Sequence, residues 1–103
     1  MSEPSSSLTL SPEQNPSTAG LEYASKLAIN EDKPVLFDYW TDSVSGNILV
    51  GVRSENDEKL LVKNVEEYTS PIKDIYRAGT DLVVVTENSI YLIADNVQTR
   101  KIS

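Results

Sequence analysis

Short apolar runs separated by turn-forming clusters fill the chain from Pro34 to Ala94. Branched and aromatic residues dominate the runs, which are VLFDYW (35–40), ILVGVR (48–53), EKLLVK (58–63), IKDIYR (72–77), LVVVT (82–86) and IYLIA (90–94). Runs of this length bounded by Gly, Asn, Asp and Ser predict β-strands. Because the connections are short, we expect sequential strands to pair antiparallel. The pattern predicts a mainly β domain over 34–103, a small antiparallel six-stranded barrel or rolled sheet, with one more short edge strand around 97–102.

The predicted core is centred on the most apolar hairpin. Residues 82–86 and 90–94 are apolar on both faces of their strands, which predicts that this hairpin is covered on two sides. Gly51 lies inside a predicted strand, where it indicates a bulge or the close approach of another segment. Gly46 and Gly79 fall within turn clusters. The density of apolar residues between Pro34 and Ala94 is enough for one compact core.

The N-terminal part of the chain differs in composition from the predicted β domain. Residues 1–16 are rich in Ser and Pro and hold few apolar side chains, so we expect a flexible polar arm there. The segment LEYASKLAI spaces its apolar residues three and four apart and predicts an amphipathic helix over 17–30, capped by Ser17 or Thr18. Pro34 follows its end. A helix this short needs tertiary support, so it packs on the sheet or, alternatively, on a partner chain.

Composition excludes several classes of function. The 103 residues include no His and no Cys, and 9 Lys+Arg stand against 16 Asp+Glu, for a net charge of −7. Disulfides, thiolate or imidazole zinc sites and His-dependent nucleophilic catalysis are therefore excluded. The acidic balance argues against double-stranded nucleic acid as a partner. Because no apolar stretch reaches the about 20 residues that span a bilayer, we expect no membrane insertion.

The N-terminus lacks the basic and apolar regions of a secretory signal. We therefore expect the protein in the cytoplasm or in a macromolecular particle such as a virion.

Carboxylates are the only plentiful reactive side chains. Asp38 and Asp42 lie in and just after the first predicted strand, but a paired-carboxylate hydrolase needs two such groups roughly 5–10 Å apart across a cleft. Glu55, Asp57 and Glu58 crowd one turn without the ligand spacing of a calcium loop. A Gly-rich phosphate loop is absent from the sequence. We predict no catalytic residue, no metal site and no cofactor.

Consecutive aromatic residues give the better indication of a binding surface. Tyr39 and Trp40 belong to the predicted strand 35–40, so they are expected to point to opposite faces of it. If Tyr39 faces the core, Trp40 faces outward and offers an anchor for a partner. The alternative is that Trp40 lies beneath the N-terminal helix.

Three further residues extend the predicted binding surface. Tyr68 lies in a polar loop, and the basic pair Arg100 and Lys101 lies near the C-terminus of an otherwise acidic chain. Basic residues there suit either the protection of an edge strand or docking on an acidic surface. The predicted partner-binding residues are thus Tyr39, Trp40, Tyr68, Arg100 and Lys101.

These patterns favour a non-catalytic protein-interaction or assembly module over an enzyme. Its expected partners are other protein subunits, as for a small structural subunit of a larger, for example viral, particle. Association between copies of the chain stays open. One alternative is an acidic inhibitor that mimics nucleic acid on its target, which the charge of −7 permits. A small carboxylate enzyme or a ligand carrier is the other.

Overall fold

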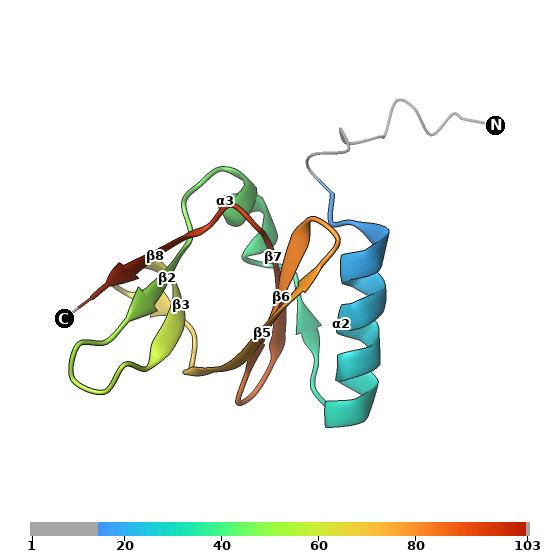
Figure 1. Ribbon diagram of the computed structural model, residues 1–103, viewed down its shortest axis with the longest axis horizontal. Coiled ribbons are helices and arrows are strands. Elements are labelled where there is room, and N and C mark those ends of the chain that lie inside the picture. The colour runs from blue at the N-terminus through green and yellow to red at the C-terminus, as the bar shows by residue number, and fades with distance from the viewer. Residues whose placement is uncertain (1–14, 103) are drawn as a thin grey trace.

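The computed structural model describes residues 15–102, in which the N-terminal helix and two four-stranded sheets form three successive layers (Figure 1). The elements in chain order are α2 (Thr18–Glu31), β1 (Val35–Leu36), α3 (Trp40–Val44), β2 (Leu49–Val52), β3 (Lys59–Asn64), β4 (Glu67–Tyr68), β5 (Ile72–Ala78), β6 (Asp81–Thr86), β7 (Ile90–Ala94) and β8 (Gln98–Lys101). The protein is therefore mainly β with one N-terminal helix, as the sequence predicted.

The two sheets have the same construction. The first sheet has the strand order β1-β7-β6-β5, and the second has the order β4-β3-β2-β8. Each contains three consecutive strands in antiparallel pairing, β5-β6-β7 or β2-β3-β4. A strand from elsewhere in the chain then pairs in parallel at one edge, β1 with β7 and β8 with β2. Each sheet thus joins a local meander to one distant strand.

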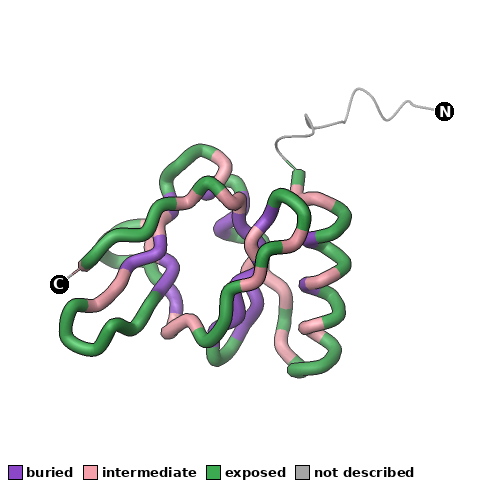
Figure 2. The backbone as a smooth tube through the Cα atoms, in the orientation of Figure 1, coloured by how far each residue is buried: buried purple, intermediate pink, exposed green. Residues whose placement is uncertain are grey.

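The first sheet is covered on both faces. On one face, α2 packs through Ala24, and the strands contribute the buried side chains Val83, Val85, Ile90 and Leu92. On the other face the first sheet packs against the second through Tyr39, Ile48, Val50, Leu61, Val84 and Ile93. Figure 2 shows the buried segments, in purple, concentrated where the layers meet. The prediction that the β6–β7 hairpin is covered on two sides is confirmed.

The helix begins where the sequence predicted. Ser17 is the N-cap, and its Oγ accepts a hydrogen bond from the N–H of Gly20 at 3.0 Å. The helix ends at Glu31, one residue later than expected, because Asp32 adopts a left-handed conformation with φ of 56°. The predicted arm of residues 1–16 lies outside the described residues except for its last two.

The expectation of a six-stranded barrel or single rolled sheet is wrong, because the strands form two separate sheets. The first predicted strand, 35–40, is also wrong beyond Leu36, since α3 begins at Trp40. Tyr39 and Trp40 are both buried, at 4% and 7% exposure. A strand turns consecutive side chains to opposite faces, whereas a helical turn allows both to reach the core.

A hydroxyl group fastens α3 to the first sheet. The Oγ of Ser43 donates to the carbonyl of Trp40 at 2.6 Å and accepts from the N–H of Ala94 at 2.9 Å. Ser43 is fully buried, so these two bonds satisfy a polar group that would otherwise be costly to desolvate. The contact fixes α3 against the end of β7.

Candidate functional site

The outer face of the second sheet is the apolar surface that the two helices leave uncovered, since α2 and α3 lie against the first sheet. Alternation along β2 sends Val50 into the core and Leu49 to the outer face. The register then aligns Leu49, Val62 and Tyr68 in one row across β2, β3 and β4. Leu60 and Gly51 form the next row. Apolar side chains that lie side by side on an uncovered face of a sheet are typical of a binding surface.

These rows form an outer groove of about 400 Å³. Its apolar lining consists of Leu49, Leu60, Val62, Val65, Tyr68 and Ile102, and its polar rim of Asn47, Arg53, Lys63 and Asn64. Leu60 is only 2% exposed, whereas Tyr68 is 53% and Val65 is 91% exposed. The groove therefore has an aliphatic floor and exposed apolar groups at one end.

Gly51 shapes the floor of the outer groove. A Cβ atom at this position would lie 2.8 Å from the Cδ1 of Ile102 and 3.0 Å from the Cγ2 of Val62. The N–H of Ile102 also donates to the carbonyl of Val52 at 2.8 Å, which extends the pairing of β8 with β2. The predicted close approach at Gly51 is thus confirmed, and the approaching segment is the C-terminal end of β8.

A second, polar hollow continues the outer groove toward β8. This amide pocket of about 270 Å³ shares Asn47 and Leu49 with the groove, and its other lining residues are Gly46, Ile48, Asn96, Gln98 and Arg100. Side-chain amides and a guanidinium provide its hydrogen-bonding groups. The lining of the two hollows therefore changes from apolar side chains near β4 to polar side chains near β8.

Cations without carboxylates line these two hollows. Arg53, Lys63 and Arg100 contribute to the lining, and no Asp or Glu does. The Nε of Arg53 lies 3.9 Å from the Oε1 of Glu58, a residue that does not line either hollow. The Nη2 of Arg100 donates to the Oε1 of Gln98 at 3.2 Å, and within residues 15–102 it makes no ion pair. In a chain of net charge −7, the charged residues that line these two hollows are all basic.

Lys63 connects the rim of the outer groove to the core. Its Nζ lies 3.0 Å from Asp42 and 3.7 Å from Glu67, and 4.9 Å from the ring centre of Tyr39. The hydrogen bond to Asp42 is the main cause that raises the pKa of Lys63. Lys63 therefore remains a cation, but one whose charge is matched by two carboxylates.

The structure brings together only some of the predicted partner-binding residues. Tyr68 lines the outer groove, and Arg100 lines the adjoining amide pocket. Lys101 lies on the opposite face of β8, in register with Val52, and its Nζ is 3.9 Å from Asp57.

The expected outward orientation of Trp40 is wrong, because Trp40 is buried. Tyr39 is buried as well, with its ring centre 5.4 Å from that of Tyr91. That these two aromatic residues contact a partner stays a prediction, and neither side chain has the exposed area that such a contact would use.

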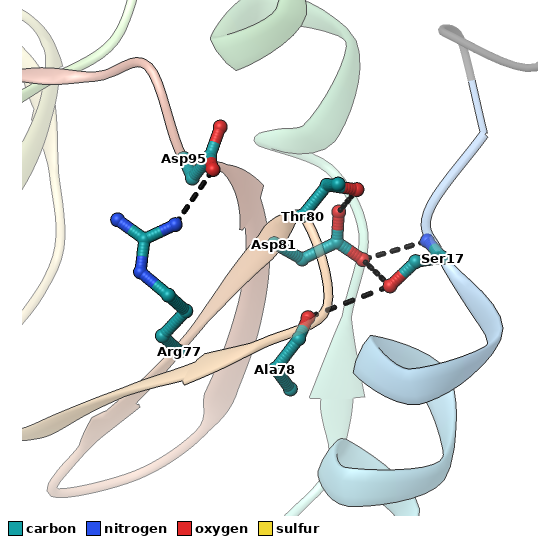
Figure 3. Close-up of polar contacts among 6 residues, drawn as sticks. All are labelled: Ser17, Arg77, Ala78, Thr80, Asp81 and Asp95. Atoms are coloured by element: carbon teal, nitrogen blue, oxygen red, sulfur yellow. Dashed lines mark hydrogen bonds and ion pairs between the residues drawn. The ribbon is translucent and has the colours of Figure 1, made fainter.

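Sequence reasoning missed the apolar residues of the groove and one buried carboxylate. Asp81, 1% exposed, accepts hydrogen bonds from Ser17, as Figure 3 shows, and so acts within the fold. Asp81 and Asp95 also border an open hollow beside Trp40, where Asp95 lies 2.7 Å from Arg77. The uninterrupted apolar run Leu60-Leu61-Val62 places apolar residues on both faces of its strand, and this run was the signal that could have predicted an apolar outer face.

Acidic clusters that could hold a metal ion and helices that could span a membrane are both absent from residues 15–102. Among residues 15–102, no three acidic side chains lie close enough together to hold a metal ion. Neither helix in the described part of the chain has the length and apolar character needed to cross a bilayer.

No protein-family model, curated protein or solved structure matches the chain.

Proposed function

We propose that the protein is a non-catalytic interaction or assembly module that binds another protein subunit through the outer groove. The observation that carries the proposal is the uncovered apolar row Leu49, Val62 and Tyr68 on the second sheet. Apolar patches that are rimmed by polar residues mark interaction sites on proteins of this size. Tyr68 supplies a half-exposed aromatic side chain of the kind that anchors interfaces.

The partner in this proposal is a protein subunit of a larger assembly, in the cytoplasm or in a particle such as a virion. The net charge of −7 favours a protein over a double-stranded nucleic acid, because phosphate binding needs clustered cations. The polar rim of Asn47, Asn64 and Arg53 suits an interface whose periphery stays hydrated.

Site-specific photo-crosslinking in the native cells tests the proposal. p-Benzoylphenylalanine replaces Tyr68 in the groove or, as the matched control, Ile29, which is 81% exposed on α2. We expect a discrete protein adduct from position 68 that is absent at position 29, with the partner identified by mass spectrometry. No adduct at 68, or the same adducts at both positions, would contradict the proposal.

A further inference from the structure

Resting on this proposed function, we propose that the outer groove receives an acidic amphipathic helix of the partner protein. Three observations carry this identification: the small size of the uncovered face, its likeness to the face that α2 covers, and the sign of its charges. Each observation restricts the occupant in a different way.

The size of the face favours a single element over a globular surface. Four strands spaced about 4.8 Å apart, with two to six residues each, make a face of at most roughly 15–20 Å on a side. That area is at most half of the about 800 Å² that each partner contributes to a standard interface. A face of this size is filled by one helix or extended segment, and two copies packed through it alone would bury less than a standard interface does.

The first sheet shows which kind of element fits. It has the same construction as the second, and α2 lies on its outer face through Ala24, Leu27 and Ala28. The 14 residues of α2 correspond to a length of about 21 Å, which matches the width of a four-stranded sheet. The second sheet presents a similar apolar face with no helix from the described chain upon it (Figure 1).

Two of the four edge strands, β8 and β5, are poor sites for an added strand, which favours occupation of the face. β8 has four exposed residues, including the cations Arg100 and Lys101. β5 has an irregularity between Ile72 and Asp74, and it carries the exposed charges of Lys73 and Arg77. Charges and bulges on edge strands oppose pairing with other chains.

Charge determines the polar face of the helix. Arg53 and Arg100 line the two hollows without any carboxylate in the lining, and Arg100 makes no ion pair within the described residues. Lys63 is not counted among these cations, because its charge is already matched by two carboxylates. A helix with apolar anchors at positions i, i+3, i+4 and i+7 and with Glu or Asp on its flanks would match both the apolar floor and these cations. Such a helix would place carboxylates over β8 and apolar side chains against Leu49 and Val62.

Titration of the ¹⁵N-labelled protein with three synthetic peptides tests this inference by NMR. The first, of about 18 residues, has a Leu stripe at helical spacing and Glu on both flanks. The second has Lys in place of Glu, and the third is the acidic peptide with a central Pro that breaks the helix. We expect the acidic peptide to shift the amide signals of Leu49, Val62 and Arg100 and to bind at least about tenfold more tightly than either other peptide.

Two charge reversals on β8 give a matched test. Arg100→Glu should weaken the acidic peptide at least about tenfold and improve the binding of the Lys peptide, because opposite charges then face each other. Lys101→Glu, the same change on the opposite face of the strand, should leave both affinities within about twofold. An unchanged dispersion of amide signals verifies that both variants fold. Equal weakening by both reversals would overturn the assignment to this face.

The remaining outcomes separate this inference from the proposed function. If the Pro peptide binds as well as the acidic helix, the occupant is an extended segment and the helix inference is overturned. Groove signals that shift with protein concentration alone, or with single-stranded DNA at physiological salt, would overturn it in favour of a second copy or a nucleic acid. If no peptide shifts these signals while Tyr68 still crosslinks a partner, the helix inference fails and the interaction function stands.

Discussion

The Oδ2 atom of Asp81 accepts hydrogen bonds from both the backbone N–H of Ser17, at 2.7 Å, and its hydroxyl, at 2.9 Å (Figure 3). Ser17 is the N-cap of α2, and Asp81 opens β6, so one buried carboxylate connects the start of the helix to the first sheet. A carboxylate at a helix N-terminus also interacts favourably with the macrodipole. The contact determines where α2 begins on the sheet.

We predict that Asp81→Asn lowers the free energy of unfolding by about 1–3 kcal/mol, because an amide is a weaker acceptor and the Ser17 donors are partly buried. Urea denaturation measures the change. Asp95→Asn is the matched control, since the same substitution there affects an exposed ion pair with Arg77 worth about 0–1 kcal/mol. Equal losses in the two variants would show that Asp81 does not hold the helix.

Gly20→Ala should destabilise the protein, although Ala favours a helix over Gly by about 1 kcal/mol. A methyl group at position 20 would overlap the Oδ2 of Asp81, so either the helix or the carboxylate must move. We expect a net loss of about 1–3 kcal/mol, as for other overpacked sites. Ser25→Ala, at an exposed position of the same helix, should be neutral or slightly stabilising in the same urea measurement. A Gly20→Ala variant as stable as the wild type would mean that this contact is loose.

Leu92→Ala should be among the most damaging single substitutions. Leu92 is fully buried between α2 and the first sheet, and truncation there leaves a cavity that costs about 2–5 kcal/mol. Small domains have a total stability of roughly 5–15 kcal/mol, so the variant should unfold at a much lower urea concentration. Val65→Ala, at a side chain 91% exposed, should not change the denaturation midpoint. A midpoint for Leu92→Ala close to that of the wild type would contradict the central place of this hairpin.

Local signals were sufficient to predict α2 and three antiparallel pairs, β2–β3, β5–β6 and β6–β7. The expected pairing of 35–40 with 48–53 and of 58–63 with 72–77 is wrong. The N-cap at Ser17 and the turns at Gly46 and Gly79 act through neighbouring residues, and these predictions are confirmed. The parallel pairs β1–β7 and β2–β8 join segments more than forty residues apart. Periodicity within a strand contains no information about such distant partners, so the arrangement as two sheets was not predictable from it.

The candidate site was predictable only in part for the same reason. Tyr68 and Arg100 were chosen from residue type, and the register of the second sheet places both on its outer face. Lys101 was chosen with Arg100, but successive residues of a strand face opposite sides. Trp40 was placed outward from strand alternation, which fails because residues 40–44 form a helix. Which face each residue occupies follows from the pairing of the strands and not from composition.

The last prediction concerns alkaline pH. Burial, followed by the negative charge of Glu67, raises the pKa of Tyr39 above its ordinary value of 10.0, and burial raises that of Tyr91 likewise. The folded protein therefore holds these protons more tightly than the unfolded chain does. Their contribution to stability is fully present below pH 10 and is lost as the pH rises through the higher pKa values of the folded state. Tyr39→Phe should flatten the fall of the urea midpoint above pH 10, with Tyr91→Phe acting in the same direction, whereas an unchanged slope in both variants would show that neither phenol is desolvated in solution.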